Sequence, residues 1–354
     1  MDDKKINIAI DLSPLYDPHH SVRGSGFYLK NLKDSIEKYS KEYSFTFFTQ
    51  TQKIPNNVSL VHFPYFEPFF LTLKLPSRVK SVVTVHDLTP LIFPNNFPSG
   101  IKGHLKWHLQ KKRLRKVSHI ITDSNSSKND IASLCSISKD KISVVYLAAS
   151  EDFKVFKDTS WKKELLKKYS LPDKFLLYVG DATWNKNLPI LVSSAIELNL
   201  PLVMIGKALS QSNDSKNGWN KDLVYVQSMA KQSNQIRILG FVENEELTKF
   251  YNIATALVMP SKYEGFGLPI LEAMQSGCPV ITTREGSIPE VAGNAAEYAD
   301  ANSKESLKET IKKVYDSHSL QRELSQKGMK QSKQFSWKKT ALETVAIYKK
   351  VINE

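Results

Sequence analysis

Two glutamates flank a glycine-rich turn in the second half of the chain. Glu264 precedes Gly265, Phe266 and Gly267, and Glu272 follows a short apolar stretch. A carboxylate accepts two hydrogen bonds at once, so each side chain suits the diol of a sugar or a ribose. The alternative for Glu272 is an acid that only complements a helix dipole. A second glutamate on the other side of the glycines favours the binding role.

The residues around this turn predict a strand, a turn and a helix in succession. The segment 256–259 is apolar, Pro269 suits a first helical turn and Gly277 suits the position after a last one, so we expect a helix over 269–276. Amide groups at the start of such a helix favour an anion such as a diphosphate. The glycines of the turn allow the backbone to approach that ligand closely.

Short apolar runs alternate with segments of helical periodicity along the chain, which predicts α/β architecture with parallel sheets flanked by helices. Between the first two runs, Leu29, Leu32, Ile36 and Tyr39 recur at helical spacing. The expected strands of the first series are 6–12, 44–48, 59–63, 81–85, 119–122 and 142–146. Those of the second series are 175–179, 202–205, 236–239, 256–259 and 280–282.

A chain of 354 residues exceeds the usual size of one core, which indicates two domains. A charged stretch, with a helix that Ser160 caps, separates the two series of strands, so we place the boundary near residue 170. The predicted parts are an N-terminal Rossmann-like domain over 1–170, a second over 171–335, and an amphipathic helix over 336–354 that begins at the N-cap Ser336. Two such sheets would enclose a ligand site between them.

Composition narrows the class of protein. An apolar content of 41% and a charged content of 24% are typical of a globular fold. Cys135 and Cys278 match no metal or disulfide spacing, and the absence of Asp-x-Asp removes a common metal anchor, so no metal is expected. The apolar run 6–10 is too short for a secretion signal or a membrane span, which favours a cytoplasmic protein, soluble or peripherally attached.

The net charge of +13 is densest over 102–116, where seven Lys or Arg residues occur without an acidic one. This segment suits anionic lipid, nucleic acid or a phosphorylated acceptor, and the alternative is a solvated helix face. The aromatic run 63–70 either touches a membrane with it or is buried. His104 and His108 have no evident third ligand, so a surface role is favoured over a metal site.

Glu-x7-Glu around Gly-Phe-Gly-Leu-Pro resembles the retaining glycosyltransferases of family 4. Further segments resemble the family in the expected order: Arg23-Gly24-Ser-Gly26, Val85-His86-Asp87, Asp123-Ser-Asn-Ser-Ser-Lys, Tyr178-Val-Gly180, Lys186-Asn187 and Leu239-Gly240-Phe241-Val242. The resemblance implies the GT-B fold, with two Rossmann-like domains facing a cleft and a last helix that crosses back to the first domain. It also implies metal-independent transfer of a sugar from a nucleotide donor with retention of configuration.

The resemblance further implies roles for individual residues. His86 and Glu264 would be catalytic, and Asp87 would lie on the acceptor side. The donor would contact Gly24, Gly26, Lys186, Phe241, Val242, Gly265, Phe266, Gly267, Leu268 and Glu272. Among these, Lys186 would neutralise the diphosphate, Glu272 would hold the ribose, and Phe241 with Val242 would border the base. Many relatives carry an arginine where this chain has Asp181 or Asn185, and Arg23 or Lys262 is a candidate substitute.

The pattern His86-Asp87-Leu-Thr-Pro-Leu resembles bacterial mannosyltransferases that use GDP-mannose, which we expect as donor, with a UDP-sugar as the alternative. The expected acceptor is a saccharide or a lipid-linked saccharide, with peripheral contact to the inner face of the cell membrane. The alternative of another class is a non-catalytic basic protein that binds nucleic acid or anionic membrane. Because no nucleic-acid module occurs, no nucleic acid partner is expected. A glycoside hydrolase would need two carboxylates across one bond.

Overall fold

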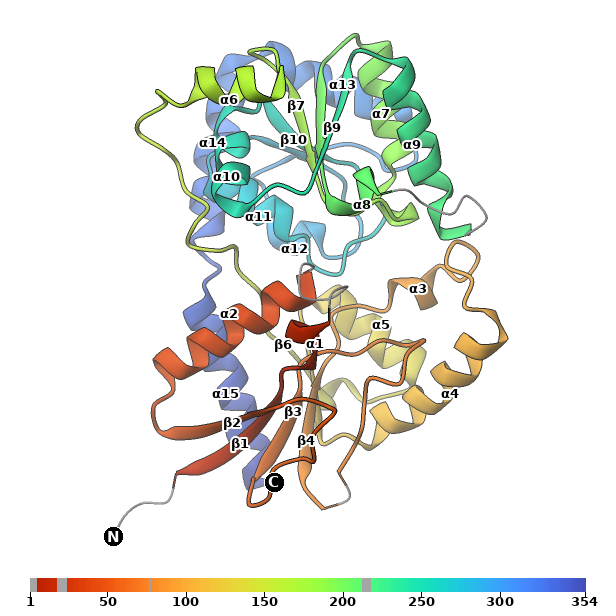
Figure 1. The fold of residues 1–354 in the computed structure, drawn as a ribbon, viewed down its shortest axis with the longest axis vertical. Helices are drawn as coiled ribbons and strands as arrows, with labels where there is room; N and C mark the ends of the chain where they lie inside the picture. The colour runs from red at the N-terminus through yellow and green to blue at the C-terminus, as the bar shows by residue number, and fades with distance from the viewer. Residues whose placement is uncertain (1–4, 18–23, 77, 212–217) are drawn as a thin grey trace. The chain divides into compact units, whose positions relative to one another are not determined.

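The computed structural model describes all residues except 1–4, 18–23, 77 and 212–217, and it divides into two compact units (Figure 1). Unit 1 contains Met1–Ala148 and Phe335–Glu354, and unit 2 contains Ala149–Gln334. The division therefore falls at residue 148 rather than near residue 170. Each unit is built on one parallel sheet of six strands. The apolar runs predict parallel sheets, with six strands in the first series and five in the second.

Backbone contacts explain why the segment after residue 148 belongs to unit 2. The Gln275 side chain donates hydrogen bonds through Nε2 to the Ser150 and Phe153 backbone carbonyls, at 2.8 and 2.7 Å. The Asn252 side chain accepts from the Phe156 amide and donates to the Lys154 carbonyl, both at 2.8 Å. Charge density in the sequence marked this stretch as a linker, but its backbone is held by unit 2.

The sheet of unit 1 has the strand order β2-β1-β3-β4-β5-β6, and every pairing in it is parallel. Its strands are β1 Ile6–Asp11, β2 Tyr43–Phe48, β3 Leu60–Phe63, β4 Lys80–Thr84, β5 His119–Thr122 and β6 Ile142–Val144. Its helices are α1 Ser13–Tyr16, α2 Gly24–Tyr39, α3 Thr89–Ile92, α4 Gly100–Lys116, α5 Asn125–Cys135, the 3-10 helix η1 Lys139–Lys141 and α15 Trp337–Asn353.

Helices α2 and α15 lie together on one face of this sheet, and α4 and α5 lie on the other (Figure 1). Leu29, Leu32 and Ile36 of α2 are fully buried, which confirms the helical spacing seen in the sequence. The terminal helix begins where predicted, because the Ser336 hydroxyl caps it by accepting a hydrogen bond from the Lys339 amide at 3.2 Å. The expected return of this helix to the first domain is observed within unit 1.

The sheet of unit 2 has the order β12-β11-β10-β7-β8-β9, and its pairings are also parallel. Its strands are β7 Leu176–Val179, β8 Leu202–Ile205, β9 Ile236–Gly240, β10 Ala256–Met259, β11 Val280–Thr282 and the unpredicted edge strand β12 Glu297–Tyr298. Its longer helices are α6 Lys162–Tyr169, α7 Leu188–Glu197, α9 Lys221–Gln232, α10 Asn244–Ile253, α11 Leu268–Gln275, α13 Lys304–Asp316 and α14 His318–Ser332. Short helical turns are η2 Trp184–Lys186, α8 Lys207–Ser210, η3 Gly218–Asn220 and α12 Ile288–Ala292.

Helices α7 and α9 cover one face of the unit 2 sheet, and α10, α11 and α14 cover the other (Figure 1). Helix α11 begins one residue before the predicted start. One cap was predicted wrongly: α6 begins after Trp161, and the Ser160 hydroxyl donates instead to Asp158 at 2.8 Å. In the described part of the chain, no helix combines the length and apolar character that a membrane span requires.

Candidate functional site

Two of the predicted site residues of unit 2, Lys186 and Glu264, form an ion pair. The Lys186 ammonium donates to both carboxylate oxygens of Glu264, at 2.8 and 2.7 Å, and the Ser261 hydroxyl donates to Oε1 at 2.6 Å. Glu264 is 6% exposed, and Ser261 is fully buried. An ammonium and a carboxylate are therefore in direct contact here. The ammonium can donate hydrogen bonds to a phosphate oxygen, and the carboxylate can accept them from a hydroxyl group.

Two loops that are far apart in sequence are joined to form this pair. The first follows β7 and carries η2, and the second follows β10, the neighbouring strand. The Lys262 amide donates to the Asn185 carbonyl at 2.7 Å, and the Asn185 side chain donates to the Tyr263 carbonyl at 2.9 Å. The Asn187 side chain donates to the Pro260 carbonyl at 3.1 Å. Asn185 thus fixes the loop that presents Glu264.

A third segment closes against the backbone of Glu264. The Ser287 hydroxyl donates to the Glu264 carbonyl at 3.0 Å and to the Phe266 carbonyl at 2.8 Å. Gly286 has φ +59°, and a Cβ added there would lie 2.6 Å from the Glu264 carbonyl oxygen. Only glycine permits this approach. Ser287 and Gly286 therefore hold the loop that carries Glu264. The sequence did not indicate them, because they lie more than twenty residues from position 264 and no motif links the two segments.

The predicted glycine turn leads directly into α11. Gly267 has φ +102°, a left-handed conformation that favours glycine, and it precedes Leu268, the first residue of the helix. Phe266 is 5% exposed, so its ring is buried and its backbone forms the turn. The amides at the start of α11 follow the loop that carries Glu264, an arrangement that suits a negatively charged ligand.

Glu272 lies on the second turn of α11 and is half-buried. Its Oε2 accepts a hydrogen bond from the Tyr251 hydroxyl of α10 at 2.9 Å. Burial raises the pKa of Glu272 from 4.5 to about 7, although the Tyr251 contact opposes this shift. No acidic residue occupies the first turn, which weakens the reading that Glu272 complements the helix dipole. A ligand that donates hydrogen bonds to this carboxylate would favour its ionised form.

The residues expected around a nucleobase differ in exposure. Phe241 is 55% exposed and Val242 is 7% exposed, and both follow β9 directly. An exposed aromatic ring at the carboxyl end of a parallel strand offers a surface against which a flat ring can stack.

In unit 1, His86 faces an aspartate of the next strand. His86 follows β4 and Asp123 follows β5, and these strands pair, so the two residues meet with Nδ1 and Oδ2 2.6 Å apart. Burial lowers the pKa of the His86 imidazole, but the Asp123 carboxylate, together with Asp87 and the Pro64 backbone, raises it, and the net direction is upward. Asp123 is 2% exposed, and in the described residues its Oδ1 has no hydrogen-bond partner. The sequence showed Asp123 only as part of a motif, because its partner depends on strand order.

A chain of buried polar groups lies behind His86. The Tyr28 ring packs edge-on against the His86 ring, with centroids 4.8 Å apart, and the Tyr28 hydroxyl lies 3.0 Å from Thr84 Oγ1. Thr84 Oγ1 also lies 2.8 Å from Nε2 of His62, and Nδ1 of His62 lies 2.6 Å from the Tyr348 hydroxyl on α15. Burial lowers the pKa of His62 to about 3, so this ring stays neutral. These hydrogen-bonded side chains connect the terminal helix α15 to β4, the strand that precedes His86.

Three predicted residues of unit 1 have local structural roles. Gly24 and Gly26 lie in α2, whose described residues start at Gly24. Arg23, the suggested phosphate ligand beside them, lies outside the described residues. The Asp87 carboxylate accepts a hydrogen bond from the Thr89 amide at 2.8 Å, at the start of α3. The Asp87 carboxylate is thus partly engaged by its own loop.

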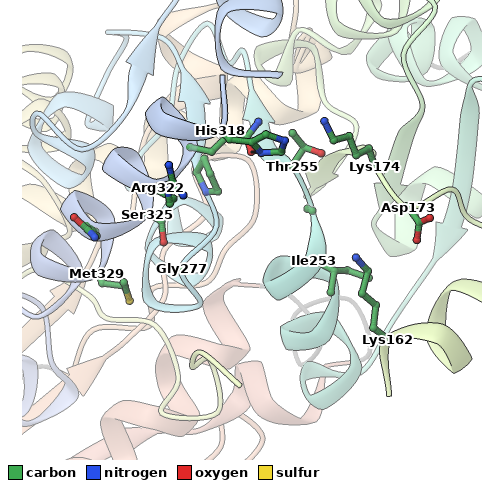
Figure 2. A pocket seen from close by; sticks show the side chains of 14 residues that line it. Lys162, Asp173, Lys174, Ile253, Thr255, Gly277, His318, Arg322, Ser325 and Met329 are labelled. Carbon is green, nitrogen blue, oxygen red and sulfur yellow. Dashed lines mark hydrogen bonds between the residues drawn. The ribbon is translucent and has the colours of Figure 1, made fainter. Parts of the chain in front are cut away.

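A cavity of about 590 Å³ lies elsewhere in unit 2 (Figure 2). Its lining includes Thr255 and Pro279, which precede β10 and β11, so it lies at the amino ends of these strands. The Lys186–Glu264 pair lies at the opposite, carboxyl ends. Figure 2 labels His318, Arg322 and Lys174 around this cavity, and none of the predicted site residues lines it. In the described part of the chain, no cluster of three or more His, Cys, Asp or Glu side chains is arranged to hold a metal.

Two family descriptions match most of the chain. Residues 161–331 match the glycosyl transferases group 1, and residues 31–152 match glycosyltransferase family 4. The O-antigen chain mannosyltransferase B of Escherichia coli is 31% identical over 284 residues, which are 78% of this chain and 72% of that protein.

Two further similarities differ in coverage. The serotype-specific mannosyltransferase WbdA of Escherichia coli is 27% identical over 74% of this chain, which spans only 32% of that longer protein. The sucrose-phosphate synthase of Thermosynechococcus elongatus has a similar fold, with a TM-score of 0.78 and 17% identity, and the match covers 99% of this chain and 100% of that one. At this identity the structural likeness concerns the fold alone.

Proposed function

This chain belongs to the family 4 glycosyltransferases and has their GT-B fold, and from that premise we propose that it transfers mannose from GDP-mannose to a saccharide acceptor. Relatives named as mannosyltransferases support mannose as the sugar. The proposed acceptor is free or lipid-linked, and the proposed stereochemical course is retention. A UDP-sugar is the alternative donor.

The Lys186–Glu264 pair carries the proposal for the donor site. When the bond between sugar and diphosphate breaks, negative charge grows on the leaving oxygen. We assign stabilisation of that charge to the Lys186 ammonium, which is held 2.7 Å from the carboxylate, together with the amides that begin α11. Glu264 then contacts the donor sugar, because its carboxylate accepts hydrogen bonds from hydroxyl groups. No metal is part of the proposed chemistry.

Lys262 is our candidate for the cation that replaces the missing arginine. Its ammonium lies 4.7 Å from the centre of the Trp184 ring, on the loop that carries Lys186. Asp181 is unsuited to this purpose because its charge is negative, and Asn185 is engaged in fixing the neighbouring loop. A Lys262→Ala variant should bind the nucleoside diphosphate more weakly if this assignment is right.

His86 has a separate proposed role toward the donor sugar. Its Nδ1 is held by Asp123, and its Nε2 is buried and has no hydrogen-bond partner among the described residues, so we assign Nε2 to the substrate contact. The raised pKa of His86 favours an imidazolium, which is a hydrogen-bond donor at both nitrogens. We propose that Asp123 positions His86 and that His86 contacts a sugar hydroxyl during transfer.

A panel of sugar nucleotides tests the proposed donor. Thermal stabilisation and turnover should be measured with GDP-mannose, UDP-glucose and ADP-glucose at equal concentration, with free GDP and UDP as binding controls. GDP-mannose should give the largest stabilisation and the only substantial release of nucleoside diphosphate in the presence of a mannose oligosaccharide. Preference for a UDP-sugar would overturn the donor assignment, and proton NMR of the product would show whether configuration is retained.

A further inference from the structure

Large apolar side chains lie on the outward side of α4 as well as on the side that packs on the fold. The inward side consists of the buried residues Gly103, Gln110 and Leu114, and Trp107 is partly buried against the core. The outward side carries three large aliphatic residues, which are Ile101 at 84% exposure, Leu105 at 66% and Leu109 at 40%. Core packing alone would leave the outward side polar. This helix therefore presents apolar surface that the fold itself does not use.

The exposed residues form one continuous stripe. A spacing of four residues places Ile101, Leu105 and Leu109 on the same side of the helix. Lys112 and Lys116 continue that line toward the C-terminal end of α4, and both are exposed. The stripe thus changes from aliphatic to cationic along the helix axis. Its first part offers apolar surface to a partner, and its last part offers positive charge.

A neighbouring loop extends the apolar surface and is fixed to the helix. Phe70 is 61% exposed and Leu71 is 43% exposed, and the Lys106 ammonium lies 5.2 Å from the centre of the Phe70 ring. The Gln110 amide donates to the Glu67 carbonyl at 3.1 Å, and Arg113 donates to the carbonyl of residue 73 at 2.9 Å. We call Phe70, Leu71, Ile101, Leu105 and Leu109 the α4 patch.

The charge on α4 itself has a single sign. No acidic residue occurs in Gly100–Lys116, and Lys102, Lys112 and Lys116 are exposed around the patch. Two other cations of the helix are partly engaged by carbonyl groups, since Arg113 donates to residue 73 and Arg115 donates to Cys135 at 2.7 Å. The free lysines therefore supply most of the charge that a partner would meet.

We propose that the α4 patch inserts into the surface of an anionic phospholipid bilayer, with the lysines on phosphate headgroups. Aliphatic and aromatic side chains with Lys on the same helix suit the boundary between acyl chains and headgroups. Nucleic acid would use the cations but leave the aliphatic stripe without a partner. This inference goes beyond the proposed transfer reaction and does not depend on it, because none of these residues belongs to the donor or His86 sites.

Vesicle binding of two variants separates the apolar and charge contributions. The wild type should cosediment with vesicles of phosphatidylcholine and phosphatidylglycerol, and weakly with phosphatidylcholine alone. Lys102→Gln, Lys112→Gln and Lys116→Gln together should lower the partition coefficient about a hundredfold, because each lysine near an anionic surface contributes about 1 kcal/mol. Ile101→Ser, Leu105→Ser and Leu109→Ser together should lower it by a similar order.

Matched controls come from the same chain. Leu342 is 44% exposed on α15, and Leu342→Ser with Lys330→Gln and Lys333→Gln should leave binding unchanged. For insertion itself, Leu105→Cys carrying an environment-sensitive fluorophore should shift to the blue on these vesicles, while labelled Leu342→Cys should not. Selective labelling is feasible because Cys135 and Cys278 are buried.

Three results would overturn the proposal. The first is vesicle binding that neither triple variant weakens, provided that their melting temperatures match that of the wild type. The second is a stable dimer that the serine variant dissociates, without vesicle binding by the wild type, which would assign the patch to a second copy. The third is salt-sensitive DNA duplex binding by the wild type with no vesicle binding.

Discussion

Replacing Glu272 by Gln should stabilise the protein above pH 7 and weaken nucleotide binding. Burial raises the pKa of this carboxyl from 4.5 to about 7 in the folded protein. Between these values the unfolded chain loses the proton first, so the folded state binds more protons and its stability falls as pH rises. Each pKa unit corresponds to about 1.36 kcal/mol, so the ionised side chain costs up to ~3 kcal/mol above pH 7.

The variant removes this penalty and keeps the main contact. A Gln carbonyl at position 272 still accepts from the Tyr251 hydroxyl, whose bond to the native carboxylate is 2.9 Å long. Urea unfolding at pH 5 and pH 8 measures the free energy of unfolding of the variant and of the wild type. The difference between the two proteins removes the contribution of the other titrating groups. We expect a small gain in stability at pH 5 and a gain of about 2 to 3 kcal/mol at pH 8.

The affinity for nucleotide should change in the opposite direction to the stability, both with rising pH and in the Glu272→Gln variant. A ribose diol that donates to Glu272 favours the ionised carboxylate, so wild-type affinity for GDP should rise from pH 6 to pH 8. Hydrogen bonds to a charged group contribute about 1.5 to 3 kcal/mol, so Glu272→Gln should bind GDP at least about tenfold more weakly at pH 8. Calorimetry should also detect proton release on binding to the wild type below pH 7.

The carboxyl of Glu197 serves as a control, because its pKa is shifted in the opposite direction to that of Glu272. Lys304 and Lys308 lower the pKa of the exposed Glu197, so Glu197→Gln should not gain stability on going from pH 5 to pH 8. Equal stability changes for Glu272→Gln at both pH values would refute the burial argument. Unchanged GDP affinity with the predicted stability gain would refute the ribose role alone.

Other variants test the geometry of the two sites. Asp123→Asn should shift the alkaline limb of the pH profile of kcat/KM to lower pH, because the Asp123 carboxylate raises the pKa of the His86 imidazolium; an unmoved limb argues against positioning by Asp123. Gly286→Ala should destabilise unit 2 by more than about 1 kcal/mol and impair transfer, since the new Cβ would lie 2.6 Å from the Glu264 carbonyl oxygen. Gly100→Ala is its control, because φ is +62° there and no atom lies within 4 Å, so only the backbone strain remains; equal effects in melting and turnover would contradict the steric argument.

The sequence predicted the strands well because buried parallel strands are short apolar runs. The segments 119–122, 202–205, 256–259 and 280–282 coincide with β5, β8, β10 and β11. The two-residue strand β12 was not found, since so short an edge element leaves no periodicity. The boundary at residue 170 was displaced because charge density does not show which unit holds a backbone.

Site residues were predicted from motifs, whereas their contacts depend on the order of strands. Nothing local pairs Lys186 with Glu264 or His86 with Asp123, because each pair joins loops that follow neighbouring strands. Gly24 and Gly26 were singled out by their resemblance to a family motif, which did not show that both residues lie in α2. The basic charge of α4 was visible in the sequence, and the exposure of its leucines was not.

The most direct test of the account is mannose transfer by Glu264→Gln. Labelled mannose from GDP-mannose should pass to a mannose oligosaccharide with the wild type, and the variant should be about a hundred- to a thousandfold slower in kcat. Circular dichroism should show an intact fold, because Gln still accepts hydrogen bonds from Ser261 and Lys186. Full activity of a folded Glu264→Gln protein would remove the Lys186–Glu264 pair from the reaction and contradict the central claim.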